Sequence, residues 1–206
     1  MENTVTISEA KKECRKEARE RQSRLNDFYI IHASNRINAR LVRTEEYKSA
    51  KTICIYMSVG KEVMTSKLIT KMLSDGKRIC LPRCLDMDNG DKILKDEHIM
   101  ETRVVSGKYK LVPGAYGIPE PSVDSPKIEP HEIDLIVVPC LTCDRECRRM
   151  GHGVGYYDRY LEKVRKDCIK TAFCFEDMLS ENVPCDIHDV AMDYVVSEKK
   201  IYKKAK

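Results

Sequence analysis

Two segments near the N-terminus repeat small or apolar residues with the period of an α-helix. A Thr-x-x-Glu capping box at residues 6–9 opens the first, in which Ala10, Cys14 and Ala18 recur at every fourth position. Residues 30–41 keep the helical period in the second, with isoleucine, alanine and leucine on one face. The chain is therefore predicted to begin with a helical segment.

Apolar, β-branched runs further along the chain predict the strands of a sheet, at residues 52–59, 78–83, 134–139, 169–175 and 193–202. We expect Pro82 to stop the second of these strands. A helix is predicted between the first two, with Thr65 as its N-cap and Gly76 at its C-terminal end. Asn-Gly within residues 87–92 is a hairpin signal, and prolines and glycines at 112–121 predict a loop.

The alternation of helices and strands indicates the fold class. The run DLIVVP at residues 134–139 is apolar without interruption, which is typical of a central parallel strand buried on both faces. We expect an α/β protein with a largely parallel central sheet flanked by helices and a helical N-terminal segment. The length of 206 residues suits one domain over residues 1–206.

Composition narrows the class of protein. Hydrophobic residues make up 42% of the chain, and no apolar run reaches the length of about 18 residues that a membrane span needs. Residues 1–16 lack the apolar core of a secretory signal, so we expect a cytoplasmic protein, and we expect a monomer. The net charge of +4 is mild and aromatic residues are 6%, which does not favour a nucleic-acid partner.

Ten cysteines raise the question of a metal. Residues 140–147 contain a Cys-x2-Cys-x3-Cys run, but a zinc site of the common kind needs a second pair of closely spaced ligands. The cysteines that follow are scattered along the chain and offer no such pair. We therefore expect reduced thiols that serve as small buried hydrophobes, with a metal site as the alternative.

Three glycines at alternate positions, Gly151, Gly153 and Gly155, follow the predicted central strand and precede a predicted helix. Glycine allows positive φ, so successive N–H groups can turn toward one point and bind an anion such as phosphate. A tight turn with close helix packing explains the same pattern, and the glycines alone leave both interpretations open.

Asp158 stands in the first turn of the predicted helix after these glycines. A carboxylate beside bound phosphates is repulsive unless a cation such as Mg²⁺ lies between them. Asp189 is a candidate for a second carboxylate, and Lys11 and Arg15, one helical turn apart, could neutralise the same anion. Asp158 could instead serve only to complement the helix dipole, and Asp189 could be a helix cap. Lys11 and Arg15 could belong to a solvated basic face.

Residues 134–161, DLIVVPCLTCDRECRRMGHGVGYYDRYL, resemble the signature of the 5-formyltetrahydrofolate cyclo-ligase family. The Lys-x-x-x-Arg pair of the N-terminal helix and the segments 53–65, 76–83 and 114–121 also follow the order and spacing of that family. The resemblance covers nearly the whole chain, and the block of glycines with Tyr-Tyr-Asp-Arg is its most specific part.

The resemblance implies that the protein closes 5-formyltetrahydrofolate to 5,10-methenyltetrahydrofolate with ATP as co-substrate and Mg²⁺ as cofactor, releasing ADP and phosphate. It assigns ATP binding to Lys11, Lys12, Arg15, Arg149, Gly151, His152, Gly153, Val154, Gly155, Tyr156 and Tyr157. It assigns folate binding to Met57, Glu62, Tyr116, His152, Gly153, Val154, Gly155 and Tyr156. It assigns the metal to Asp158 and Asp189. No covalent nucleophile is implied, because phosphoryl transfer needs mainly positioning and charge neutralisation.

Some positions depart from the family pattern. Cys140 and Cys143 replace a glycine and a phenylalanine, and His152 stands where tyrosine or arginine is frequent. Val154 stands where glycine or lysine is frequent, and valine cannot bond a phosphate oxygen through its side chain.

Three alternatives follow. Val154 would suit a folate- or nucleotide-binding relative without turnover. The basic N-terminal helix would suit a nucleic-acid-binding module, and the α/β architecture would suit a sugar-phosphate isomerase that needs no ATP.

Overall fold

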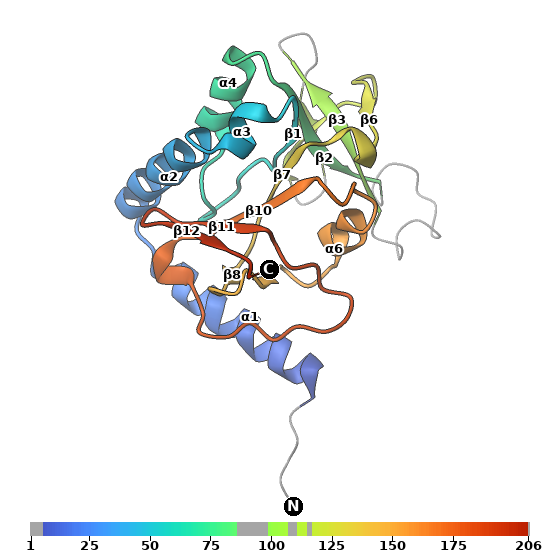
Figure 1. Cartoon of the computed structure of the whole chain (residues 1–206). Helices are drawn as coiled ribbons and strands as arrows, with labels where there is room; N and C mark the ends of the chain where they lie inside the picture. Colours follow the sequence, from blue (N-terminus) through green and yellow to red (C-terminus); the bar gives the residue numbers. More distant parts are fainter. Residues whose placement is uncertain (1–5, 86–98, 107–110, 115–116, 206) are drawn as a thin grey trace, which may run out of the picture.

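A computed structural model describes residues 6–85, 99–106, 111–114 and 117–205 and arranges them around one mixed sheet (Figure 1). The sheet order is β12 (Ile201–Lys203), β11 (Tyr194–Val196), β10 (Ile169–Phe173), β7 (Leu135–Val138), β1 (Thr52–Cys54), β2 (Arg78–Cys84), β3 (Met100–Val105) and β6 (Lys127–Ile128). Neighbours from β11 to β2 are parallel, whereas the β11–β12, β2–β3 and β3–β6 pairs are antiparallel. The predicted fold class is confirmed.

Helices and short ribbons surround this sheet. The α-helices are α1 (Ile7–Ser23), α2 (Asp27–Val42), α3 (Glu45–Ser49), α4 (Ser66–Ser74) and α6 (Tyr156–Leu161). Single 3₁₀ turns form at η2 (Pro130–Glu132) and η3 (Glu176–Met178). Two antiparallel ribbons stand apart from the sheet: β4 (Leu111–Pro113) with β5 (Pro119–Pro121), and β8 (Thr142–Cys143) with β9 (Arg149–Met150). In the view of Figure 1, α2, α3 and α4 lie to the left of the sheet, α6 to the right and α1 below.

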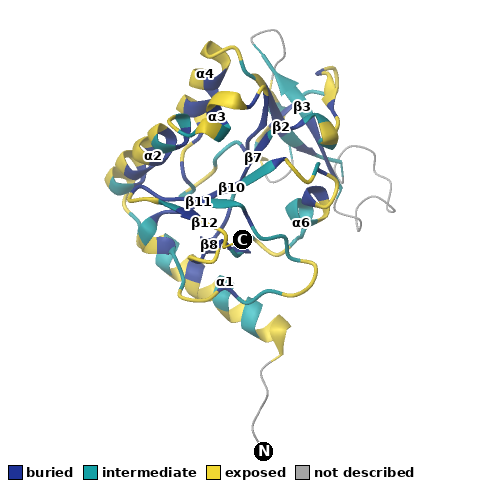
Figure 2. Cartoon of the chain, viewed as in Figure 1, coloured by how far each residue is buried: buried dark blue, intermediate teal, exposed yellow. Residues whose placement is uncertain are grey.

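The core centres on β7, which is dark blue along its length in Figure 2. All four residues of this strand have 0% exposure, and β1 and β10 flank it in parallel. Each such side chain contributes about 1.5–3 kcal/mol by leaving water. The expected central strand is therefore confirmed.

The N-terminal helices form as their sequence predicts. The Thr6 hydroxyl caps α1 by accepting a hydrogen bond from the Glu9 N–H, and the Glu9 carboxylate accepts one from the Thr6 N–H. Ala18 is the buried residue of α1, whereas α2 buries six residues, four of them apolar. The first helix therefore packs with little apolar area and needs polar contacts to hold its place.

The first predicted strand is shorter than expected, because the chain leaves the sheet after Cys54. Ser58 and Thr65 exchange bonds between their N–H groups and hydroxyls at 3.1 Å, and the Thr65 hydroxyl also donates to the Tyr56 carbonyl at 2.8 Å. These bonds replace the strand ladder. Thr65 occupies the N-cap position of α4, but its side chain makes no capping bond.

Pro82 does not stop β2, which continues to Cys84. The ladder to β1 ends at Cys80, so Pro82 has a strand neighbour only on the β3 side. A missing N–H costs little at such an edge position.

Two further predictions are corrected. Residues 193–202 form two antiparallel strands, β11 and β12, because the chain reverses where the Ser197 N–H bonds to the Lys200 carbonyl. Residues 112–121 contain the β4–β5 ribbon, whose prolines are tolerated because each strand has one partner. The hairpin expected at 87–92 lies outside the described residues. Within the described part of the chain, none of the helices has the length and apolar character to cross a bilayer.

Candidate active site

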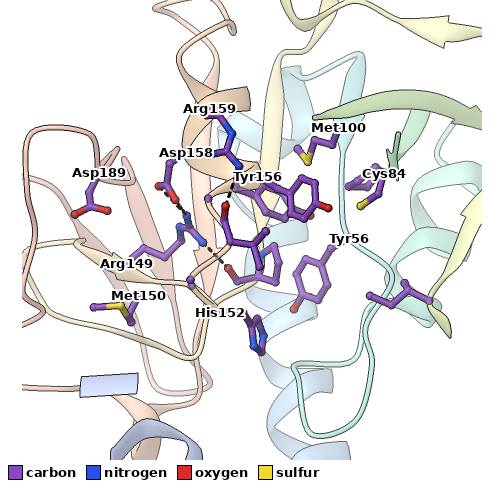
Figure 3. Close-up of a pocket in the computed structure, with 18 of the residues that line it drawn as sticks. Tyr56, Cys84, Met100, Arg149, Met150, His152, Tyr156, Asp158, Arg159 and Asp189 are labelled. Atoms are coloured by element: carbon purple, nitrogen blue, oxygen red, sulfur yellow. Dashed lines mark hydrogen bonds and ion pairs between the residues drawn. The ribbon is translucent and has the colours of Figure 1, made fainter. Parts of the chain in front are cut away.

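A cavity of about 860 Å³ opens where the parallel strands end (Figure 3). Met57 reaches it from the loop after β1, Cys84 from the end of β2, and Pro139 from the residue following β7. The carboxyl ends of parallel strands are where open α/β sheets bind ligands. A volume of this size suits a small-molecule site.

Most residues singled out from the sequence meet in this cavity. It is lined by Lys11, Arg15, Met57, Glu62, Arg149, Gly151, His152, Gly153, Val154, Gly155, Tyr156, Tyr157, Asp158 and Asp189. Lys12 does not line it and is exposed, because neighbouring helix residues point about 100° apart. Tyr116 lies outside the described residues.

The glycine loop has the backbone that its sequence predicts. Gly153 has φ +106° and Gly155 has φ +83°, and both values lie in the region that favours glycine. A Cβ atom on Gly153 would stand 3.1 Å from the Arg15 Nε, so a side chain there would crowd the guanidinium. Gly155 is the N-cap of α6, which places the loop at the start of a short helix.

Helix α1 is tied to this loop by its basic side chains. The Arg15 Nε donates to the Gly151 carbonyl at 3.2 Å, and the Arg19 Nη2 donates to the His152 carbonyl at 3.4 Å. These two residues are one helical turn apart, so one face of α1 follows the loop. These polar contacts hold α1 in place, because the helix buries little apolar area.

Arg149 and Asp158 form an enclosed ion pair in the cavity. The Arg149 Nη2 lies 2.8 and 3.0 Å from the two Asp158 oxygens, and the side chains are 3% and 26% exposed. Nη1 donates to the Pro139 carbonyl at 3.2 Å, and the guanidinium lies 5.8 Å from the centre of the Tyr157 ring. The buried Arg149 Nε has no hydrogen-bond partner among the described residues.

Lys11 lines the cavity and contacts two carboxylates. Its Nζ lies 2.6 Å from Asp186 and 2.5 Å from Asp189. Partial burial lowers the pKa of Lys11, but the bonds to the two carboxylates outweigh that effect and raise the pKa above its usual value. The bond from Lys11, helped by the His188 N–H, lowers the pKa of Asp186. Lys11 therefore stays charged across the physiological range.

Glu62 and its neighbours form the wall nearest the end of β1. One Glu62 oxygen accepts the Val59 N–H at 2.9 Å, and the other lies 3.7 Å from the His152 Nε2. The Glu62 side chain is 10% exposed, so the carboxylate has a fixed orientation toward the glycine loop. Burial raises the pKa of Tyr56, which keeps that phenol neutral beside it.

The structure adds site residues that the sequence did not suggest. Asp186 could have been found from its Asp-x-x-Asp spacing with Asp189. Arg159 lines the cavity and donates to the Val154 carbonyl at 2.8 Å, which brings a guanidinium to the position where the valine side chain cannot bond phosphate. Met100 lines the cavity from a strand that carries no recognisable motif.

The two carboxylates proposed for a metal both line the cavity, Asp158 from α6 and Asp189 from the loop before β11 (Figure 3). Carboxylate oxygens are the ligands that Mg²⁺ prefers, and Mg²⁺ usually keeps several waters alongside one or two of them. Each carboxylate is bonded to a single cation here, and its remaining lone pairs stay available. The donor set therefore fits a hard divalent cation.

Comparisons with known proteins agree with this geometry. The model of the 5-formyltetrahydrofolate cyclo-ligase family matches residues 7–198. A Schizosaccharomyces pombe protein named "Probable 5-formyltetrahydrofolate cyclo-ligase" is 32% identical over 195 residues, which cover 87% of this chain and 91% of that protein. The 5-formyltetrahydrofolate cyclo-ligase of Mus musculus is 28% identical, with 94% and 96% covered.

A solved structure shares the fold. The NMR structure of Aquifex aeolicus 5,10-methenyltetrahydrofolate synthetase matches with a TM-score of 0.80 and 27% identity, covering 95% of this chain and 93% of that one. The family resemblance inferred from residues 134–161 is confirmed, whereas the roles of individual site residues remain predictions.

Proposed function

This chain belongs to the 5-formyltetrahydrofolate cyclo-ligase family, and we propose that its cavity closes 5-formyltetrahydrofolate to 5,10-methenyltetrahydrofolate with MgATP. One observation carries the proposal. A single cavity of about 860 Å³ holds the glycine loop, basic side chains and two carboxylates at one side and the Glu62 wall at the other. Two small molecules can therefore meet in it.

The phosphate side of the proposal rests on charge. Lys11, Arg15, Arg149 and the glycine N–H groups would neutralise and orient the triphosphate. Asp158 and Asp189 would hold Mg²⁺, which when bound neutralises charge on the phosphate oxygens. Lys12 is too exposed to contribute more than a distant charge, and its assignment to ATP is the weakest of the set.

The folate side rests on shape and hydrogen bonding. The buried Glu62 carboxylate would accept bonds from the amino and ring N–H groups of the pterin, and Met57 would pack against the ring. The proposed contact of Tyr116 with the same ring system is stacking. His152 and its glycine neighbours stand between the two sides, where the reacting groups would meet.

The reaction itself needs no protein nucleophile. The formyl oxygen would attack the γ-phosphorus of ATP, with ADP leaving, and the resulting imidoyl phosphate would be attacked at carbon by N10, whose proton passes to the departing phosphate or to water. Ring closure then expels phosphate and leaves the methenyl bridge. The protein would position the two substrates and neutralise the charge that moves from the γ-phosphate to ADP.

An absorbance time course tests the proposal. Purified protein is mixed with 5-formyltetrahydrofolate, ATP and Mg²⁺ in mildly acidic buffer, and the near-ultraviolet band of the methenyl product is followed. We expect the band to grow and to be absent when ATP is left out or Mg²⁺ is chelated. A band that grows equally well without ATP would contradict the proposed chemistry.

Val154 supports a second candidate, a relative that binds folate and nucleotide without turnover. The valine side chain offers no donor to phosphate, although Arg159 reaches the same backbone carbonyl. A folded protein that binds ATP in calorimetry but yields no methenyl band would favour this second candidate.

The remaining expectations stay predictions. They are a cytoplasmic location, a monomeric state and the lack of a nucleic-acid partner. A relative from Arabidopsis thaliana is named as mitochondrial, so membership of the family does not fix the compartment.

A further inference from the structure

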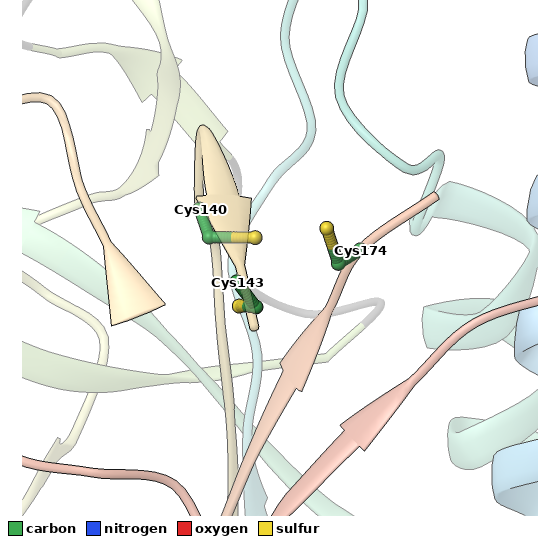
Figure 4. A group of neighbouring side chains, drawn as sticks. All are labelled: Cys140, Cys143 and Cys174. Atoms are coloured by element: carbon green, nitrogen blue, oxygen red, sulfur yellow. The ribbon is translucent and has the colours of Figure 1, made fainter. Parts of the chain in front are cut away.

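Three cysteine side chains, from the ends of β7 and β10 and from β8, lie close together (Figure 4). The sulfur atoms of Cys140, Cys143 and Cys174 all lie within 4.8 Å of one another. Their residues are 9%, 0% and 2% exposed, and all three are reduced. Within the described part of the chain, no other group of three metal-ligating side chains is as close.

Strand register brings the distant Cys174 to the other two. In the β7–β10 ladder Val138 pairs with Ala172, an offset of 34 residues (172 − 138). Continued for two residues, this register puts Cys174 opposite Cys140. The Cys140 thiol donates to the Phe173 carbonyl at 3.1 Å, so the segment after β7 is still adjacent to the end of β10 there. Cys147 continues the sequence run but is not part of the group.

Cys143 reaches the group from the β8–β9 ribbon. This residue pairs with Arg149 across the ribbon, so one small element carries a thiol to the cluster and a guanidinium to the catalytic cavity. Two strand ends and one ribbon therefore fix the three sulfurs from separate directions. A ligand set held in this way is preorganised.

A second, much smaller cavity adjoins the thiols. It has a volume of about 10 Å³ and is lined by Cys140, Cys174, Tyr56 and Glu62 among others. That volume is room for about one water molecule. A metal held by the three sulfurs would therefore find space for a fourth, non-protein ligand.

The burial of the three sulfur atoms bears on their ionisation. Thiolate rather than thiol is the metal ligand, and burial disfavours the charged form. A bound cation offsets that cost, and its binding releases protons from the thiols.

We infer that Cys140, Cys143 and Cys174 form a binding site for a thiophilic cation of the Zn²⁺ class, with water as the fourth ligand. Zn–S bonds of about 2.3 Å put tetrahedral sulfur ligands about 3.8 Å apart, so the side chains need to move by about 1 Å or less. Three protein ligands with one open position is an arrangement that zinc adopts. Mg²⁺ is excluded from this site because it prefers oxygen ligands.

Cobalt substitution tests the inference, because Co²⁺ occupies tetrahedral zinc sites and absorbs light there. The reduced full-length protein is titrated with Co²⁺ without oxygen, and then with Zn²⁺. We expect sulfur-to-cobalt charge-transfer bands and intense visible bands that saturate at one Co²⁺ per chain. Zn²⁺ should abolish them, and excess Mg²⁺ should leave them unchanged.

Single substitutions identify the ligands. Cys143→Ser and Cys174→Ser should each weaken Co²⁺ binding by more than the roughly 10–100-fold that loss of an outer hydrogen-bond partner costs. Cys168→Ser is the matched control, because Cys168 is also buried, at 1% exposure, but lies outside the group. Its Co²⁺ spectrum should equal that of the wild type.

Alkylation of the wild-type chain provides a readout that no substitution can disturb. Bound Zn²⁺ should slow the modification of Cys140, Cys143 and Cys174 in mass spectrometry and leave that of Cys168 unchanged. The inference is overturned if the wild type gives no sulfur-to-cobalt band. It is also overturned if the band survives in the Cys143→Ser and Cys174→Ser variants, or if Zn²⁺ protects Cys168 as strongly as the other three.

Discussion

The proposed active-site cavity and the cluster of Cys140, Cys143 and Cys174 share a wall but present different kinds of ligand atom. The cavity presents carboxylates, guanidinium groups and backbone N–H groups, which suit Mg²⁺ and phosphate. The cluster presents three sulfur atoms and almost no access to solvent. Tyr56 and Glu62 line both. The two proposed cation sites would therefore differ in the ion they select, because hard cations prefer oxygen and soft ones prefer sulfur.

The strongest test of this separation is Asp158→Asn. The change keeps the shape of the side chain and removes the charge proposed to hold Mg²⁺, so turnover should fall by at least about 100-fold. The loss of stability should be smaller than the 3–5 kcal/mol of a broken buried pair, at about 2 kcal/mol, because Asp158 is 26% exposed. The methenyl absorbance assay and thermal unfolding measure the two effects.

Asp167→Asn is the matched control for this change, since Asp167 follows α6 and its side chain is 80% exposed. It should leave turnover unchanged. Near-normal Mg²⁺-dependent turnover in Asp158→Asn would show that the metal assignment is wrong. A lost Co²⁺–thiolate spectrum in that variant would show that the two sites are not separate.

A smaller effect is expected from Gly153→Ala. The added Cβ would stand 3.1 Å from the Arg15 Nε, and the alanine would have to adopt the φ of +106° that Gly153 has. We expect the KM for ATP to rise about tenfold, which corresponds to about 1.4 kcal/mol of binding. Initial rates at varied ATP concentration give this value.

Gly76→Ala separates backbone strain from loss of the site. Gly76 also has a positive φ, +73°, but its Cβ would meet no atom within 4 Å and it lies outside the cavity. Both variants should lose about 1–2 kcal/mol of stability, and only Gly153→Ala should lose ATP affinity. Equal KM values for the two variants would argue against the phosphate loop.

The smallest expected effect concerns the pH dependence of the Lys11 contact. The pKa of Asp186 is lowered in the folded protein, so its contribution is present above the ordinary value of 3.8 and is lost as the pH falls through the folded value. The pKa of Lys11 is raised, so its contribution is present below 10.5 and is lost as the pH rises beyond the folded value. The contact should therefore be constant near neutrality.

Melting temperatures of the wild type and Asp186→Asn measure that contact. The wild type should melt higher at pH 7, and the difference should shrink as the pH falls toward 3. The exposed Asp124 provides a control, as Asp124→Asn should show no such difference. A difference that grows in acid would contradict the assigned pKa direction of Asp186.

Features that depend on a short stretch of sequence were predicted, whereas features that depend on the pairing of distant strands were not. The glycine loop and Asp158 lie within eight residues of chain, from 151 to 158, so a short motif was enough to suggest a phosphate and metal site as one of two interpretations. Cys174 joins Cys140 only through the register of β7 with β10, and the sequence does not encode that pairing in any short motif. The spacing of the cysteines in the sequence therefore did not predict that Cys140, Cys143 and Cys174 come together.

The same contrast holds for the fold. The buried run at 134–139 was recognised because four residues in sequence are apolar, and β7 forms there. The hairpin of β11 and β12 was missed because its turn, residues 197–200, contains no glycine, proline, asparagine or aspartate to signal a reversal of the chain. The length of β1 was overestimated because side-chain bonds of Thr65 replace the ladder after Cys54, and such bonds follow from the tertiary fold rather than from local preference.

The attachment of α1 has a consequence for biosynthesis. Arg15 is 136 residues from Gly151 and Lys11 is 175 residues from Asp186, so this helix leaves the ribosome long before its partners exist. At about 5–20 residues per second, the interval between Lys11 and Asp186 is roughly 9–35 s. During that time α1 has one buried alanine to pack and no phosphate loop to bind. Completion of the proposed active-site cavity is thus a late event in biosynthesis, and its timing is set by the distance along the chain between the first helix and the loop before β11.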